Sequence, residues 1–292
     1  MNSAASFTEL WQLASVQRAL FALVLGAIGL PIVGVVIIGL DIMPVRFAMM
    51  HVALLGIAVG MLTGLDPMLC AVAACAASGA ALTPMARSPA GLSGAMGLLM
   101  SLAIAGALLV LSVAGVNANG AFGLLWGSIL ATRTGDVVLL GILAVIVPAL
   151  FVFRRRQLGL LLHDRELAAC SGVRVDRLTL MLLVLVAVSV AAGIRLTGAL
   201  LVDALTLLPA LAARRLANSL PGMVFAAVTV GMLVNVTGFV LAVCLDLPPG
   251  PVLVLSAGAV ALSVHVLPDW RTRGWRSSRE SGSHATDSVS LH

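Results

Sequence analysis

The chain has 292 residues, of which 61% are hydrophobic and 10% are charged, and its formal net charge is +5. Soluble domains are about 45–50% apolar and about 25% charged, so this composition excludes a soluble globule and indicates a protein that lies in lipid. It also excludes a secreted disulfide scaffold, a disordered chain and a nucleic-acid binder, because the basic excess is better explained as a membrane-topology signal.

Apolar runs predict an all-α fold: a polytopic transmembrane helical bundle of about nine spans, within a range of eight to ten. Crossing a hydrocarbon core of about 30 Å takes roughly 20 apolar residues in a helix. Runs that meet this need lie at residues 19–40, 47–64, 68–85, 95–114, 136–153, 177–195, 198–213, 222–244 and 250–267. The glycine-rich segment 116–134 is only moderately apolar, and a re-entrant helix and a surface helix both fit it.

Two flanking segments complete the expected domain plan around a transmembrane domain at residues 19–267. Residues 1–18 are either an outer end of the chain or a segment that lies along the membrane interface. Residues 268–292 hold many serines and few apolar residues, which predicts a disordered tail.

The arginines orient the predicted bundle. Fourteen of the 17 fall on one side of an alternating nine-span arrangement, and the exceptions are Arg18, Arg133 and Arg195. Cytoplasmic loops of membrane proteins are enriched in basic residues, so the arginine-rich side is predicted to be cytoplasmic. We therefore expect a multi-pass protein of the plasma (inner) membrane whose C-terminal tail lies in the cytoplasm.

All of the basic residues are arginine, and the sequence contains no lysine. A P-loop ATPase needs a lysine that reaches the terminal phosphates, and a protein kinase needs one for the same purpose. We therefore expect that this chain is not an enzyme of either kind. If ATP drives its function, the hydrolysis takes place on a separate chain.

One predicted cytoplasmic loop, residues 154–178, carries six arginines and three acids. Asp164 is placed to cap a short helix, Glu166 falls in its first turn, where the helix dipole favours a negative charge, and Gly172 can end it. Such a helix is either an interfacial segment or a docking surface for a cytosolic partner. The missing lysine makes an ATPase the attractive partner.

Three patterns occur together in the second half of the chain. One is the set in the charged loop: Asp164, Glu166, Ala168, Gly172, Val173 and Val175. The others are the run GALLVDALTLLPALAARRL from Gly198 to Leu216 and a Pro-Gly-Pro turn at residues 249–251. In their order and spacing, from about Trp126 onward, they resemble the permease subunits of bacterial zinc and manganese ABC transporters, the ABC-3 family.

The resemblance implies a cobalamin-importer-like permease fold and a homodimer with a central metal path. It further implies cytosolic ABC ATPase subunits docked on a coupling helix from Asp164 to Gly172, and an extracytoplasmic metal-binding protein as the donor. Gly198 and Pro209 would then serve helix packing or shape the path. The chain would be a transporter subunit that imports Zn²⁺ first and Mn²⁺ second by alternating access, without a tightly bound cofactor.

Two ionisable residues within predicted spans are candidate metal ligands, because a charge in lipid is costly and so suggests function. In the ABC-3 family an aspartate precedes the equivalent of His51 by four residues, but that position is Phe47 here. Asp203 is expected to supply the missing carboxylate, so that His51 and Asp203 bind the metal transiently together with symmetry mates. The other explanation is that both side chains only hydrogen-bond neighbouring helices, with Asn235 as a partner of Asp203.

Three other functions stay open. An ABC importer of a metal chelate, such as a siderophore or cobalamin, has a related architecture, although its motifs differ. A non-transporting membrane scaffold of the same fold is favoured by Phe47 at the aspartate position. A proton-coupled secondary transporter fits the composition alone, and it would work without an ATPase partner.

Overall fold

The computed structural model describes residues 13–84, 89–115, 129, 132–197 and 199–266. No strand occurs within these ranges, and this confirms the all-α prediction. The helices are α2 (Ala14–Gly39), α3 (Met43–Thr63), α4 (Pro67–Leu82), α5 (Pro89–Val113), α7 (Thr134–His163), α8 (Arg165–Cys170), α9 (Val175–Thr197), α10 (Ala199–Leu216), α11 (Leu220–Cys244) and α12 (Pro249–Val266).

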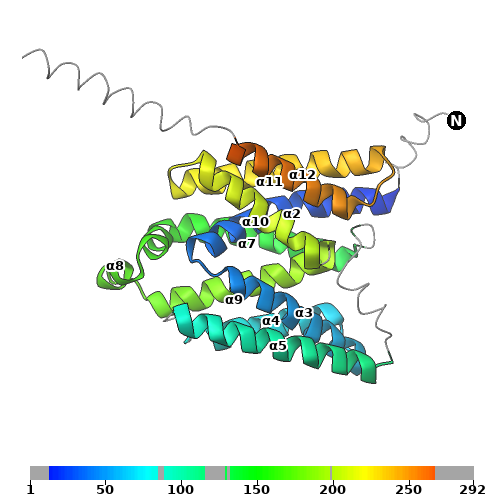
Figure 1. Cartoon of the computed structure of the whole chain (residues 1–292), viewed down its shortest axis with the longest axis horizontal. Coiled ribbons are helices and arrows are strands. Elements are labelled where there is room, and N and C mark those ends of the chain that lie inside the picture. Colours follow the sequence, from blue (N-terminus) through cyan, green and yellow to red (C-terminus); the bar gives the residue numbers. More distant parts are fainter. Residues whose placement is uncertain (1–12, 85–88, 116–128, 130–131, 198, 267–292) are drawn as a thin grey trace, which may run out of the picture.

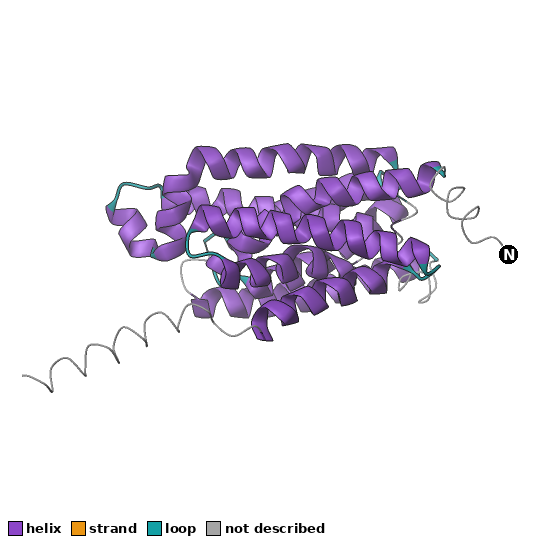
Figure 2. Cartoon of the chain, turned by 90° about the horizontal axis from the view of Figure 1, so that it is seen from above, coloured by secondary structure: helices purple, strands orange, loops and turns teal. Residues whose placement is uncertain are grey.

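The long helices lie side by side along one direction, and the short helix α8 projects at one end of the bundle (Figure 1). α3, α4 and α5 pack together on one side, whereas α2, α7, α10, α11 and α12 pack together on the other. α9 contacts helices of both groups and joins them. The view from above shows the same side-by-side arrangement (Figure 2).

Successive long helices alternate in direction. α2, α4, α7, α10 and α12 run toward the end where α8 lies, and α3, α5, α9 and α11 run away from it (Figure 1). A Cβ added at Gly39, the last residue of α2, would lie 2.9 Å from Leu162 near the end of α7, so these two helices finish together. This alternation is what a chain that crosses a membrane repeatedly requires.

Seven of the described helices are long and apolar enough to cross a membrane: α2, α3, α5, α7, α9, α11 and α12. α4 is apolar but has only 16 residues. α10 has 18 residues and carries Asp203, Arg214 and Arg215. The chain is therefore a multi-pass helical bundle by length and composition, while the count of nine spans stays a prediction.

The helices extend past several of the predicted span boundaries, by five residues or more at the start of α2, the start of α5 and the end of α7. α7 has 30 residues and continues through Arg154, Arg155 and Arg156 to His163, beyond the predicted span end at residue 153. Arginine ends an apolar run but is a good helix former, so the helix persists where the hydropathy drops. α2 begins at Ala14, so residues 14–18 belong to the first long helix.

Three predicted segments lie outside the described residues. They are residues 1–12 of the N-terminal segment, most of the re-entrant or surface helix at 116–134, and the tail at 268–292.

α2 is the most buried of the long helices. Every residue from Gly29 to Ile38 is buried, because α7, α9, α10 and α11 all pack around it. A helix that is apolar on all sides can lie inside a bundle or face lipid, so it is the packing of these four helices that places α2 in the interior.

Glycines set the closest helix contacts. A Cβ added at Gly34 in α2 would lie 2.8 Å from the carbonyl carbon of Thr206 in α10, and one at Gly56 in α3 would lie 2.6 Å from Cα of Ala71 in α4. Both distances are shorter than real Cβ contacts, so only glycine permits these approaches. Small residues at interfaces are how helices pack closely in lipid.

Candidate functional site

The arginine-rich loop folds into the short helix α8, as predicted. The Asp164 carboxylate accepts hydrogen bonds from the backbone N–H of Glu166 (2.7 Å) and of Leu167 (3.0 Å), and it thereby caps the helix. These donors, Leu167 first and Glu166 second, lower the pKa of Asp164 below its ordinary value, and the neighbouring His163 adds to the effect. Glu166 lies in the first turn of α8, where the helix dipole favours its charge.

The end of α8 is fixed by backbone geometry. Gly172 adopts φ +78°, a left-handed conformation that is costly for residues with a Cβ, and its N–H donates to Ala169 O at 3.1 Å. The N–H of Val173 donates to Ala168 O at 3.1 Å. The chain therefore reverses sharply after α8 and enters α9.

α8 is anchored on the bundle and still exposes part of its surface. Ala168 is fully buried, and Arg165 forms an ion pair with Asp176 of α9 at 3.3 Å. Glu166 is exposed and Leu167 is 49% exposed. A short helix with a buried inner face, a charged residue and an apolar residue outside has the form of a docking element.

His51 lies in α3, eight residues after the helix begins. Its Nδ1 lies 2.7 Å from the carbonyl oxygen of Phe47. Because a carbonyl oxygen only accepts hydrogen bonds, Nδ1 carries the proton and Nε2 keeps its lone pair. Metal-binding histidines commonly have this second hydrogen bond, since it fixes the tautomer and the ring orientation.

Phe47, which stands where the ABC-3 pattern has an aspartate, is stacked under a buried arginine. The Arg46 guanidinium carbon lies 4.5 Å from the centre of the Phe47 ring, and Arg46 is only 3% exposed. By its position in the sequence, Arg46 is one of the arginines predicted to mark the cytoplasmic side. Its burial depends on how α3 packs, although the adjacent aromatic residue was a signal for a cation–π pair.

Asp203 lies in α10, four residues after the helix begins, and only its backbone position is described. α10 packs against α2, α9, α11 and α12, while α3 packs against α4, α5 and α9, so both helices share α9 as a neighbour. α3 begins at the α8 end and α10 runs toward that end (Figure 1). Thr206 of α10 lies against Gly34, five residues before α2 ends, and Asp203 is three residues farther from that end. At 1.5 Å per residue, Asp203 and His51 each lie about 12 Å from the α8 end, which places them at similar depths.

Among the described residues, no group of three or more His, Cys, Asp or Glu side chains could hold a metal ion. Asn235 donates from Nδ2 to the carbonyl oxygen of Leu23 at 3.1 Å, and so it joins α11 to α2. The convergence of His51 and Asp203 on one path stays a prediction.

Of Gly198 and Pro209, which are predicted to pack helices or shape the path, the structure describes Pro209. Pro209 is buried, and a Cβ added at Gly231 in α11 would lie 3.7 Å from Pro209 and 2.7 Å from Pro31 in α2. α2, α10 and α11 therefore meet where two of them carry a proline. Gly198 lies outside the described residues.

Apolar helices that alternate in direction, with a short capped helix at one end, define a multi-pass membrane protein. The chain belongs to the ABC 3 transport family, which matches residues 12–267. This confirms the family predicted from the three sequence patterns. The chain is thus a component of a transport system and not an enzyme.

Relatives and a solved structure agree with this assignment. The chain is 30% identical over 141 residues to the high-affinity zinc uptake system membrane protein ZnuB of Haemophilus influenzae, covering 48% of this chain and 54% of ZnuB. It is 29% identical over 198 residues to the manganese transport system membrane protein MntC of Halalkalibacterium halodurans, covering 66% and 67%. The match thus spans about half the length of ZnuB.

The similarity in three dimensions extends over almost the whole chain. The structure of PsaBC from Streptococcus pneumoniae in complex with Fab has a chain that aligns with a TM-score of 0.80 and 25% sequence identity. The alignment covers 94% of this chain and 99% of that chain.

Proposed function

We propose that the chain is the membrane-spanning permease subunit of an ATP-driven importer of divalent transition metal ions, zinc first and manganese second. The observation that carries the proposal is the family match over residues 12–267, with the Asp164-capped helix α8 inside it. The relatives named for zinc and for manganese transport support both metals as cargo.

In this proposal α8 is the coupling helix on which a cytosolic ABC ATPase docks. The Asp164 cap, the buried Ala168 and the Arg165–Asp176 ion pair hold α8 to α7 and α9, so that a push on α8 is transmitted to two long helices. Exposed Glu166 and Leu167 are the surface offered to the ATPase. An extracytoplasmic metal-binding protein delivers the ion at the opposite end.

The proposed topology has nine spans, with α4 and α10 included. Nine alternating helices put the start of α2 outside and the end of α12 in the cytoplasm, together with α8 and the arginine-rich segments. In this topology α10 crosses the membrane with Asp203 inside it. Arg214 and Arg215, in its last turn, then lie at the cytoplasmic interface.

His51 and Asp203 act together as transient ligands on the path, which their similar depths support. The free Nε2 of His51 is a ligand for zinc, and an Asp carboxylate suits both zinc and manganese. A single imidazole or carboxylate holds a divalent ion weakly, which permits release. Two copies of the chain in a homodimer would supply a second set of these ligands.

The test is uptake of radioactive zinc and manganese by vesicles that hold the permease, its ATPase and its binding protein. We expect that vesicles with the complete complex take up the ions only when ATP is supplied to the ATPase. Uptake driven by a proton gradient without the ATPase would indicate a secondary transporter. An assembled complex that carries neither ion would favour the non-transporting scaffold, which Phe47 at the aspartate position also favours.

A further inference from the structure

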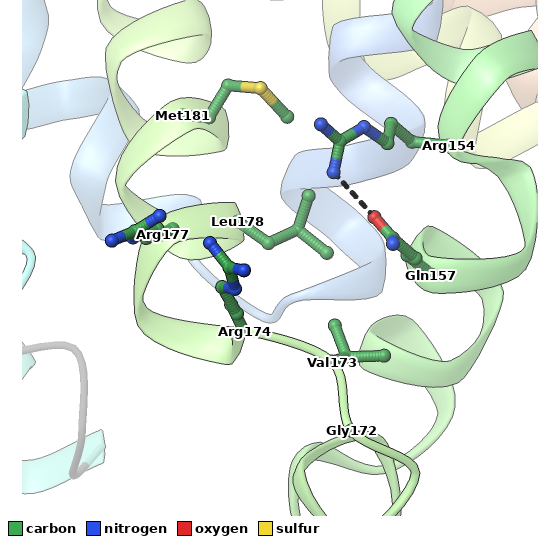
Figure 3. Close-up of a pocket in the computed structure, with 8 residues that line it drawn as sticks. All are labelled: Arg154, Gln157, Gly172, Val173, Arg174, Arg177, Leu178 and Met181. Carbon is green, nitrogen blue, oxygen red and sulfur yellow. Dashed lines mark hydrogen bonds between the residues drawn. The ribbon is translucent and has the colours of Figure 1, made fainter.

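A basic cleft lies between the last third of α7 and the start of α9, beside α8. Its lining includes Arg154 and Gln157 from α7 and Arg174, Arg177, Leu178 and Met181 at or within the start of α9, and its volume is about 440 Å³ (Figure 3). No acidic side chain is among the residues that line it. We call it the arginine cleft.

Two arginines border this cleft from different elements. Arg154 points from α7 toward α9, and it donates a hydrogen bond to Oε1 of Gln157 at 2.8 Å, which fixes its direction (Figure 3). Arg174 extends beside Leu178 at the start of α9, whereas Arg177 points away (Figure 3). Like charges that border one cleft repel, so an anion between Arg154 and Arg174 would relieve the repulsion.

The nearby acids are placed elsewhere. Asp176 forms the ion pair with Arg165, and Glu166 and Asp176 line a neighbouring hollow beside α8, which shares Arg174 and Arg177 with the arginine cleft. No carboxylate is therefore among the residues that line the cleft with Arg154 and Arg174. An anion from another molecule would balance their charge.

The cleft lies where the apolar surface of the bundle ends. Val152 is 64% exposed and Phe153 is 85% exposed directly before Arg154, so the lipid-facing surface of α7 stops at this point. α7 is about 45 Å long, which exceeds a hydrocarbon core of about 30 Å, and its remaining residues extend beyond the core. Within the cleft, apolar Leu178 and Met181 follow the arginines along α9 toward the bundle.

We propose that the arginine cleft binds the phosphate of an anionic phospholipid. The phosphate lies between Arg154 and Arg174, and the glycerol and acyl chains extend past Leu178 and Met181. Basic pockets between transmembrane helices at the cytoplasmic side are suited to anionic head groups. The bound lipid bridges α7 and α9, the two helices that carry α8, and so it steadies α8. The docking role of α8 and the choice of leaflet rest on the proposed function, whereas the binding of the lipid does not.

The test is native mass spectrometry of the purified full chain titrated with phosphatidylglycerol or with phosphatidylcholine. The informative variant is Arg154→Gln with Arg174→Gln. The matched control is Arg155→Gln with Arg156→Gln, which removes the same charge from exposed arginines outside the lining. We expect the first pair to weaken phosphatidylglycerol binding about tenfold and the control pair to leave most of it intact.

Thermal melting supplies a second measurement. The shift that lipid causes is compared with the melting temperature of the same variant without lipid, so a difference in stability between variants does not affect it. Phosphatidylglycerol should raise the melting temperature of the wild type and of the control pair, but not that of the cleft variant, since only a ligand that binds the folded state stabilises it. Equal losses in the two pairs would overturn the proposal in favour of diffuse surface charge. Stabilisation by inorganic phosphate but not by phosphatidylglycerol, or displacement of the lipid by the bound ATPase, would also overturn it.

Discussion

The contact between Gly34 of α2 and Thr206 of α10 yields a prediction that can be worked out from distances. Gly34→Ala places a Cβ 2.8 Å from the Thr206 carbonyl carbon and 3.0 Å from Cβ of Ala210, whereas ordinary contact begins at 3.4 Å. The obstacle is backbone within a helix, so no side chain can rotate away. The added Cβ would also overlap the Thr206 carbonyl oxygen, which is its nearest atom. α2 and α10 must therefore move apart by more than the roughly 0.6 Å that the carbonyl carbon alone requires, which forfeits a quarter or more of the dispersion attraction along their contact.

The expected cost is about 3 kcal/mol, at the upper end of what overpacking usually costs, because both partners are rigid. In a thermal melt of the purified chain this corresponds to a fall in Tm of about 6–12 °C. Thr206 lies three residues after Asp203, so the same displacement moves the predicted ligand, and metal uptake should fall further than the amount of folded protein.

The matched control is Gly97→Ala in α5. A Cβ there meets nothing within 4 Å, so the substitution should stabilise its helix by about 0.5–1 kcal/mol, because alanine loses less backbone entropy than glycine. The two variants thus make the same chemical change, but their expected effects on the free energy of unfolding have opposite signs. A Gly34→Ala chain that melts within about 2 °C of the wild type would refute the close approach of α2 and α10.

Three further predictions concern the docking helix and the candidate ligand. Because folding lowers the pKa of Asp164, its cap is fully formed above the unfolded pKa of about 3.9 and is lost as the pH falls through the folded value. The protection of the Glu166 and Leu167 amides from hydrogen exchange, measured against their intrinsic rates, should therefore fall there. Asp164→Asn should keep this protection through the same acidic range and Asp164→Ala should lose it at every pH; identical profiles for all three chains would contradict the cap. Gly172→Ala forces a Cβ into φ +78° at a cost of about 1 kcal/mol and should weaken ATPase docking, whereas Gly159→Ala, with nothing within 4 Å, should not; equal affinities would count against a fixed α8 end. His51→Gln removes the Nε2 ligand and should raise the KM for zinc uptake about tenfold, and an unchanged KM would exclude His51 from the path.

The short-range features of α8 could be predicted residue by residue. Asp164 caps α8 and Gly172 ends it because both effects depend on hydrogen bonds and dihedral angles within a few residues. The all-α class was equally accessible, since so apolar a chain must satisfy its backbone groups within helices.

What could not be predicted depends on contacts between distant segments. The apolar run ends before Arg154, but α7 continues to His163, because helix propensity and affinity for lipid are separate properties. Arg46 belongs to an arginine-rich side by its position, yet packing buries it over Phe47. The arginine cleft could not be predicted from the sequence because Arg154 and Arg174 border one cleft only through the reversal at Gly172.

The proposed metal path through this chain is tested most directly by Asp203→Asn in the reconstituted complex, with uptake of radioactive zinc and manganese measured in the presence of ATP. Asp246→Asn, the same change at an exposed acid between α11 and α12, is the control. We expect Asp203→Asn to abolish uptake of both ions while ATPase docking and the control stay at wild-type levels. Undiminished uptake by Asp203→Asn would contradict the proposed path.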